Sequence, residues 1–202
     1  MITTYIGVGT NVEREQHALA EYQELLQLGE SLLVSPVYEC EPIGFSSQNF
    51  YNFVVAMRTE LSLEELSHQL REIEFKWGRE ENAQKYQDRT LDLDIVLFGE
   101  CVSKKKPELP RSDIYKYPFV TKPLYDLEPQ LVIPGDGRTV ADIWHAMQPV
   151  DSLKPVSFSF LICLGSSTNF NKSSISLLSH LVLRSEVLAS LGSLELLIIS
   201  II

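Results

Sequence analysis

Two aspartates stand two residues apart inside an otherwise apolar stretch of this 202-residue sequence, the run DLDIVLF that begins at Asp92. Side chains at this spacing on a β-strand point to the same face, so Asp92 and Asp94 would lie side by side. Neighbouring carboxylates repel each other unless a cation lies between them, and their hard oxygens suit Mg²⁺ that also binds substrate phosphates. The spacing therefore indicates a magnesium and phosphate site, while a solvated sheet face with two ordinary acids fits the same pattern.

Positive charge lies just upstream of the two aspartates, at Arg79, Lys85 and Arg89. The chain as a whole has 17 Lys and Arg against 27 Asp and Glu, a formal net charge of −10. This balance argues against nucleic acid or an anionic membrane as a partner. A phosphate ligand would need a local cationic patch, which these three side chains could supply.

Other signatures of chemistry are missing from the sequence. The glycines of GVGTNV, at 7–12, lack the third glycine of a dinucleotide-binding fingerprint, and no GxxxxGK[ST] loop occurs. GxSxG and HExxH are also absent, so hydrolase triads and zinc proteases have no support. The cysteines Cys40, Cys101 and Cys163 have no CxxC spacing, and the start of the chain does not resemble a secretion signal. We therefore expect a reducing, cytoplasmic location.

The elements that would position these residues alternate between strand and helix patterns. A capping-box pattern at Ser62 and Glu65 begins one helix, Asn11 is the expected N-cap of another, and a turn at 99–100 leads back through 101–102. Helices combined with hairpin-like strand pairs predict an α+β fold with a largely antiparallel sheet. Strands are expected at 5–8, 32–39, 50–59, 89–98 and 131–133, and helices at 12–28, 62–77 and 139–147.

Apolar spacing also predicts which faces of the first two helices are buried. The expected inner residues are Ala18, Tyr22, Leu25 and Leu26 in helix 12–28, and Leu63, Leu66, Leu70 and Ile73 in helix 62–77. No internal repeat competes with this single-domain interpretation.

The sequence changes character after about residue 155. Residues 156–202 carry only four charged side chains and are rich in serine and leucine, so the whole net charge lies in residues 1–155. We expect a folded domain over 1–155 and an extension over 156–202 outside the catalytic fold. The end LLIISII is apolar, but Arg184, Glu186 and Glu195 interrupt every window near the roughly 20 residues that a membrane-spanning helix needs.

Six sequence blocks in order resemble one protein family. They are YIGVGTN at 5–11, PIG at 42–44, FYNFV at 50–54, IEFKWGR at 73–79, RTLDLDIVLFG at 89–99 and YPFVTKPLYDLEP at 117–129. Together they resemble the 6-hydroxymethyl-7,8-dihydropterin pyrophosphokinases of folate biosynthesis, over about residues 2–150. The resemblance implies a ferredoxin-like α/β/α sandwich that transfers the terminal diphosphate of ATP to the pterin hydroxymethyl group and releases AMP. It implies no protein partner.

On the phosphate side, the resemblance implies that Asp92 and Asp94 hold two Mg²⁺ ions that bridge the ATP phosphates. Arg89 and Arg79 match positions that contact these phosphates, and the polar run 78–88 matches a lid that closes over ATP. Further residues that the resemblance places near ATP are Glu74, Lys85, Arg111 and Lys116.

On the pterin side, the resemblance implies two aromatic faces and a few fixed polar partners. Phe50 and Phe119 match the stacking positions, and Asn52 matches the hydrogen-bonding asparagine. Taken alone, the two phenylalanines would be assigned to the core. The segment that matches the loop reading the pterin amide edge consists of Cys40, Glu41, Pro42, Ile43 and Gly44.

The departures from the family pattern fall on the ATP side. Gln87 and Asp88 replace a usual Gly-Pro, and Glu81 stands where a second lid arginine is common. Arg111 stands where histidine is usual, and Tyr117 where arginine is usual. Two alternatives to an active pyrophosphokinase therefore stay open at this point: a non-catalytic or altered-specificity relative that binds pterin or nucleotide, and a form of either anchored by its tail.

Overall fold

The computed structural model describes residues 1–80, 87–162 and 197–200. The chain divides into two compact units, Met1–Ser157 and Phe158–Ile202. In the second unit, β7 (Ser159–Ile162) pairs antiparallel with β8 (Leu197–Ser200). No helix in the described ranges is long and apolar enough to cross a bilayer. Most of the predicted extension, with its three interrupting charges, lies outside the described residues, and its role stays a prediction.

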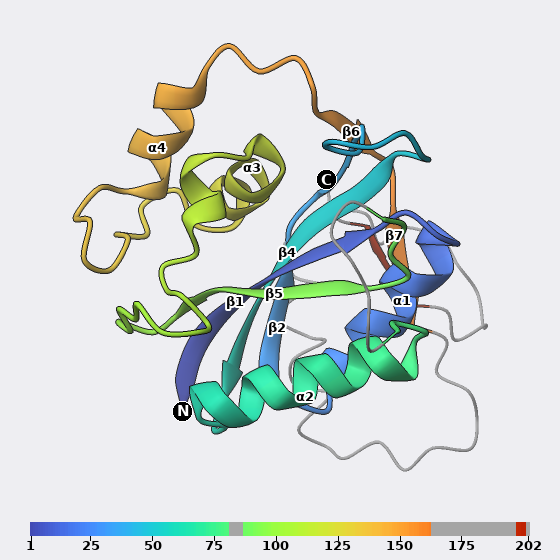
Figure 1. Ribbon diagram of the computed structural model, residues 1–202, viewed down its shortest axis with the longest axis horizontal. Coiled ribbons are helices and arrows are strands. Elements are labelled where there is room, and N and C mark those ends of the chain that lie inside the picture. The colour runs from blue at the N-terminus through green and yellow to red at the C-terminus, as the bar shows by residue number, and fades with distance from the viewer. Residues whose placement is uncertain (81–86, 163–196, 201–202) are drawn as a thin grey trace. The chain divides into compact units, whose positions relative to one another are not determined.

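The first unit is built on one antiparallel sheet of six strands (Figure 1). Its main path runs β5-β1-β4-β3-β6, and β2 also pairs with β4. The strands are β1 (Ile2–Thr10), β2 (Glu30–Val34), β3 (Val37–Cys40), β4 (Phe50–Thr59), β5 (Asp92–Phe98) and β6 (Lys154–Val156). The predicted strand 50–59 is confirmed as β4, and the expected antiparallel α+β class is confirmed.

Helices cover both faces of this sheet, which gives the α/β/α sandwich (Figure 1). One face carries α1 (Arg14–Leu25) and α2 (Leu63–Lys76), and the other carries α3 (Pro118–Leu127) and α4 (Val140–Met147). A short 3-10 helix, η1 (Ser112–Tyr115), leads into α3. The capping box of α2 is confirmed, since Ser62 accepts from the Glu65 N–H and Glu65 accepts from the Ser62 N–H.

Apolar side chains of the central strands are buried on both faces of the sheet. Of the four apolar residues predicted to face inward from α2, Leu66, Leu70 and Ile73 are buried and Leu63 is half-buried. On the other face, sheet residues such as Val54 and Val96 pack with η1, α3 and α4. The central strands therefore pack against helices on both faces, and such strands are suited to holding functional side chains in fixed positions.

Several local predictions were wrong. The expected strand 32–39 is two strands, because it is interrupted at Ser35 and Pro36, and a proline has no N–H for the ladder. Segment 101–102 forms no strand, and 131–133 contributes only the single bridge from Val132 to Thr139. Helix α3 was not predicted because Pro118 and Pro123 obscure its pattern; Pro118 occupies the first turn, where no N–H is needed.

The first helix also differs from its prediction. Asn11 is not its N-cap, because α1 begins after Glu13, which caps without a side-chain hydrogen bond. Leu26 is 43% exposed, whereas Glu21 is fully buried. The helix is rotated so that a carboxyl group, rather than the expected leucine, faces the interior.

Glu21 is a source of instability that substitution can remove. Both of its carboxylate oxygens are buried, and neither has a hydrogen-bond partner in the described part of the chain. Burial raises its pKa well above the ordinary value, so the folded state holds a proton that the unfolded state releases. Stability should therefore fall as pH rises above the unfolded pKa of about 4.

We expect Glu21→Met to raise the free energy of unfolding by about 1–3 kcal/mol at pH 8, because the apolar side chain needs no hydrogen bond. The gain should shrink as the pH is lowered towards 4. Denaturant unfolding at several pH values measures this change, with Glu15→Gln on the exposed face of the same helix as the control. A destabilised Glu21→Met variant at pH 8 would contradict the prediction.

Candidate active site

The site lies on the face of the sheet that α3 covers, where strands β4, β1 and β5 run side by side. In the register of these strands, Asn52 lies opposite Gly9, and Gly9 lies opposite Asp92. Gly7 lies opposite Asp94 in the same way. The Val96 side chain fills the space above Gly7, whereas Gly9 lines a pocket. Because Gly9 has no side chain, a trough lies between the Asn52 side and the carboxylate side of the sheet.

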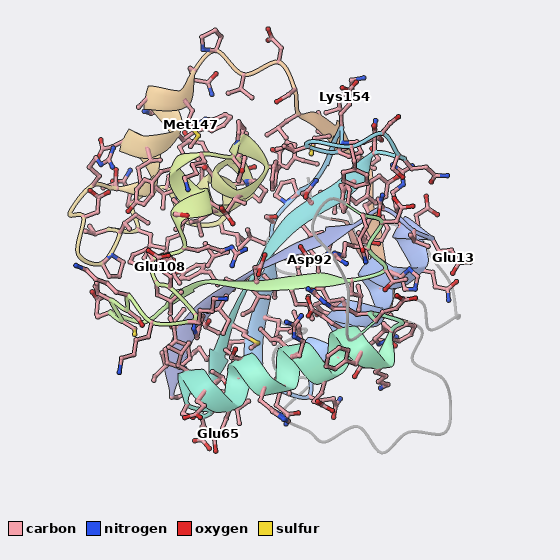
Figure 2. The ribbon with its side chains drawn as sticks, in the orientation of Figure 1. Glu13, Glu65, Asp92, Glu108, Met147 and Lys154 are labelled. Atoms are coloured by element: carbon pink, nitrogen blue, oxygen red, sulfur yellow. The ribbon has the colours of Figure 1, made fainter. Side chains whose placement is uncertain are left out.

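This trough forms part of a pocket of about 900 Å³. Asp92, Asp94 and Arg89 line one part of it, and Phe50 and Asn52 line another. Figure 2 shows Asp92 near the middle of the first unit, whereas Glu65 at the start of α2 lies at its edge. A single cavity therefore brings together residues that are separated by about 40 positions in the sequence.

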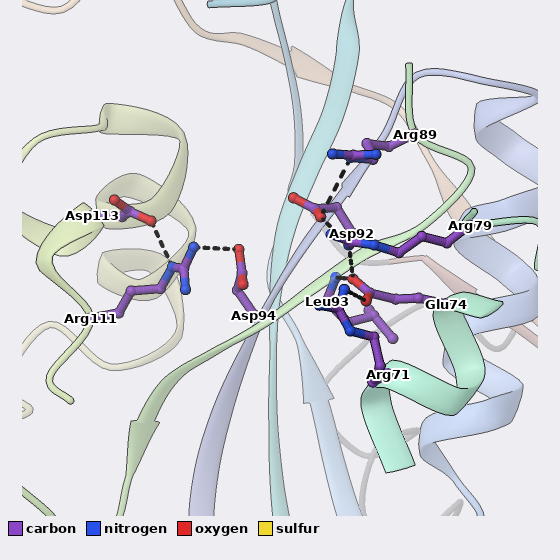
Figure 3. Close-up of polar contacts among 9 residues, drawn as sticks. All are labelled: Arg71, Glu74, Arg79, Arg89, Asp92, Leu93, Asp94, Arg111 and Asp113. Atoms are coloured by element: carbon purple, nitrogen blue, oxygen red, sulfur yellow. Dashed lines mark hydrogen bonds and ion pairs between the residues drawn. The ribbon is translucent and has the colours of Figure 1, made fainter. Parts of the chain in front are cut away.

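Arginines approach the two carboxylates from opposite sides (Figure 3). Arg79 Nη1 donates to Asp92 Oδ1 at 3.2 Å, and Arg89 Nε lies 3.9 Å from the same oxygen. From the other side, Arg111 Nη2 lies 2.8 Å from Asp94 Oδ2. Arg111 Nε also donates to Asp113 Oδ2 at 2.6 Å. Asp92 and Asp94 thus have compensating cations that a phosphate could also use.

Burial and neighbouring charged groups alter the protonation of Asp94. Burial, and then the negative charge of Asp92, raise the pKa of Asp94 to about 7, while Arg111 opposes the shift. The side chain is still 38% exposed and faces the pocket. A divalent cation bound between the carboxylates would favour the ionised form, so cation binding and proton release at Asp94 should be linked.

Glu74 connects α2 to the edge of the sheet. It is 4% exposed, and its Oε1 accepts from the Leu93 N–H of β5 at 2.9 Å and from Arg79 Nη1 at 2.8 Å. Burial raises the pKa of Glu74, and these two donors oppose the rise. Glu74 therefore holds the guanidinium of Arg79 in place against Asp92.

Asn11 performs a similar task for Arg89. Its Oδ1 accepts from the Arg89 N–H at 2.7 Å, and its Nδ2 donates to Asp88 Oδ1 at 2.8 Å. The same Nδ2 lies 3.4 Å from Ser47 Oγ and from the Gln48 carbonyl oxygen. Asn11 joins the loop after β3 to the segment before β5, a role that no local sequence pattern indicates.

The residues expected to hold a flat ring also line the pocket. Cys40, Glu41, Pro42 and Ile43 come from the end of β3 and the loop after it, and Phe50 lies opposite Cys40 in the β3–β4 register. Phe119 enters from α3, with the ring of Tyr117 stacked on it at a centroid distance of 5.1 Å. Tyr117, which stands where the family usually has arginine, thus supports an aromatic wall here.

Three expected site residues are placed differently or lie outside the described part. Lys116 is exposed, donates to Ser112 Oγ, and is not among the residues that line the pocket. Gly44 adopts a positive φ of 81°, which suits a turn, and also lies outside the pocket lining. Lys85 and most of the expected lid, 81–86, lie outside the described residues.

The fold and site together define an α+β protein that presents paired carboxylates and arginines beside an aromatic and amide wall. A model of the family described as 7,8-dihydro-6-hydroxymethylpterin-pyrophosphokinase (HPPK) matches residues 5–129. The chain belongs to this family.

Curated relatives agree over most of the chain. The 2-amino-4-hydroxy-6-hydroxymethyldihydropteridine pyrophosphokinase of Aquifex aeolicus is 32% identical over 158 residues, which cover 77% of this chain and 96% of that one. The protein of the same name from Porphyromonas gingivalis is 36% identical over 138 residues, or 65% and 94% of the two chains. A crystal structure of Plasmodium falciparum HPPK-DHPS shares the fold, with a TM-score of 0.57 at 11% identity, and the match covers 78% of this chain and 47% of that one.

Proposed function

We propose that this chain transfers the terminal diphosphate of ATP to the hydroxymethyl group of 6-hydroxymethyl-7,8-dihydropterin, which gives AMP and the pterin diphosphate in folate synthesis. One observation supports placing this reaction in the pocket: Gly9 of β1 lies between Asn52 on β4 and Asp92 on β5, along a single trough. A flat ring on one side would thus place its hydroxymethyl arm beside the carboxylates. The names of the relatives favour an active enzyme over a non-catalytic binding protein.

In the pterin half, Phe50 and Phe119 would stack on the ring, and Asn52 would hydrogen-bond its edge. Stacking on an aromatic side chain is worth about 1–3 kcal/mol for a nucleobase, and a pterin presents a similar face. The backbone of 40–44 would contact the amide edge. These contacts fix the position of the ring and therefore the direction of its hydroxymethyl oxygen.

In the phosphate half, Asp92 and Asp94 would hold two Mg²⁺ ions, because hard carboxylate oxygens on one sheet face are suitable ligands. Within the described ranges, no cluster of three or more acidic, His or Cys side chains could hold a metal. The remaining ligands would thus come from water and ATP. Bound Mg²⁺ would offset negative charge on the phosphates.

The protein's own residues would position the two substrates and neutralise charge on the phosphates. The hydroxymethyl oxygen forms a bond to the β-phosphorus, the bond between that phosphorus and the bridging oxygen of AMP breaks, and AMP leaves with the bridging oxygen. Arg79, Arg89 and Arg111 would compensate the charge on the phosphates, and Asp92 would orient the hydroxyl or accept its proton.

Mass spectrometry of the reaction mixture tests this function directly. The full chain should form AMP and pterin diphosphate from ATP only when hydroxymethyldihydropterin and Mg²⁺ are both present. Absence of AMP under these conditions would refute the assignment. A cytoplasmic location is proposed with it, since the cysteine usage fits a reducing compartment.

Gly9→Ala tests the trough itself. A Cβ at position 9 would lie 3.7 Å from Asn52 Oδ1 and 3.8 Å from Asp92 Cβ, which are ordinary contact distances. Folding should therefore survive, and the melting temperature should not fall, because alanine is favoured over glycine in a strand. The methyl group would nevertheless fill the space between the ring and the carboxylates, so we expect kcat/KM for pterin to fall about 10²-fold. An unchanged kcat/KM would place the substrate elsewhere.

A further inference from the structure

We infer that Cys40 is a positioning residue for pterin recognition, because its thiol holds the amide of Asn52 with the oxygen facing the pocket. This inference rests on the proposed function and adds to it a side chain from β3. Cys40 lies opposite Phe50 in the β3–β4 ladder, and Asn52 follows two residues later on the same face of β4. The thiol and the amide are therefore diagonal neighbours on the sheet.

Counting donors and acceptors fixes the orientation of the amide. Asn52 Nδ2 donates to Cys40 Sγ at 3.1 Å and lies 3.4 Å from the carbonyl oxygen of Phe50. A side-chain amide has two N–H donors, and a carbonyl oxygen can only accept, so the nitrogen must face these two groups. Both donors are then used within the protein.

The amide oxygen is left for the ligand. Among the described residues, no donor contacts Asn52 Oδ1, and this oxygen lies 3.7 Å from the position that a Cβ of Gly9 would occupy. It thus borders the trough as an acceptor. A ligand must present an N–H to it, as the ring nitrogens and amino group of a dihydropterin do.

The thiol suits this role because it is neutral. Cys40 is 8% exposed, and burial raises its pKa to about 11 even though the hydrogen bond from Asn52 opposes the rise. A neutral sulfur is a weak acceptor, and a serine hydroxyl at the same place would accept at least as well. Alanine or valine would accept nothing, so only the longer contact with the Phe50 carbonyl oxygen, at 3.4 Å, would hold the amide nitrogen. The amide could then rotate more readily and present its nitrogen to the pocket.

Steady-state kinetics and calorimetry on four variants of the full chain test the inference. Cys40→Ala and Cys40→Val should each raise the KM for hydroxymethyldihydropterin about fivefold, the effect of one net hydrogen bond. For both, kcat and the affinity for α,β-methylene-ATP with Mg²⁺ should stay within about twofold of wild type. Cys40→Ser should restore the wild-type KM. Cys101→Ala serves as the control, because Cys101 does not line the pocket.

The possible failures are distinguishable. If the wild-type chain forms no AMP, the proposed function fails and this inference fails with it. If the wild type is active and Cys40→Ala and Cys40→Val keep its pterin KM, the inference alone is overturned. A Cys40→Ser variant as weak as Cys40→Ala would also overturn it, because packing rather than hydrogen bonding would then explain the loss. Melting temperatures of all four variants detect any loss of folded protein.

Discussion

Asp92→Asn and Asp94→Asn are each expected to lower the rate of AMP formation by at least about 10³-fold. Each substitution removes one charged oxygen from the two proposed Mg²⁺ ligands and would therefore weaken charge compensation worth several kcal/mol in the transition state. The asparagine amide can also turn a donor towards a guanidinium, because Arg79 donates to Asp92 and Arg111 forms an ion pair with Asp94. Single-turnover measurement of AMP separates this loss of chemistry from slow product release.

Two comparisons make the result specific to the metal site. Mn²⁺ binding with α,β-methylene-ATP, followed by electron paramagnetic resonance, should weaken in both variants. Asp136→Asn should behave as wild type, because Asp136 pairs with Arg138 away from the pocket. Full activity in both Asp92→Asn and Asp94→Asn would remove the metal assignment.

Arg111→Ala is expected to lower kcat/KM for ATP by about 10²- to 10³-fold. A cation placed on a transferring phosphate can be worth about 10³-fold or more in rate, and Arg111 stands 2.8 Å from a proposed metal ligand. In the absence of nucleotide it compensates Asp94 and Asp113, and with nucleotide it would compensate the phosphates. Arg111→Lys should recover part of the loss, because lysine keeps the charge but not the planar fork.

The control for this prediction is Arg138→Ala. Arg138 also pairs with an aspartate and lies over the ring of Tyr115, but it does not line the pocket. Its removal should leave kcat/KM for ATP within about twofold. If Arg111→Ala behaves in the same way, then Arg111 is only a structural ion-pair partner, and its replacement of the usual histidine has no catalytic meaning.

Sequence patterns predicted the parts of the fold that depend on local physics. The ten residues of β4 and the capping box of α2 follow from strand propensity and cap chemistry, and both are confirmed. The two carboxylates share a face as their spacing required. The residues proposed to bind the ring were identified only by the resemblance, because Phe50 in a strand and Phe119 in a helix would otherwise be assigned to the core.

What could not be predicted depends on contacts between distant elements. Gly9 lies between Asn52 and Asp92 because of the register in which β1 pairs with β4 and β5. The sequence of one strand does not determine how it aligns with its neighbours. Asn11 looked like a helix cap because the sequence does not show that Arg89 lies beside it. Helical spacing does not predict that Glu21 is buried, because apolar residues including Leu26 form a consistent inner face without it.

Strand β5 ends the sheet on one side, so its outer N–H and C=O groups could recruit another strand. Glu74 accepts a hydrogen bond from the outer N–H of Leu93, and the backbone N–H of Arg111 donates to the carbonyl oxygen of Val96. The side chain that orients Arg79 therefore also blocks this edge. Loss of the Glu74 side chain would leave the outer N–H of Leu93 without its partner on an edge strand, which favours self-association through strand pairing. It would also leave Arg79 less well placed to bind phosphate.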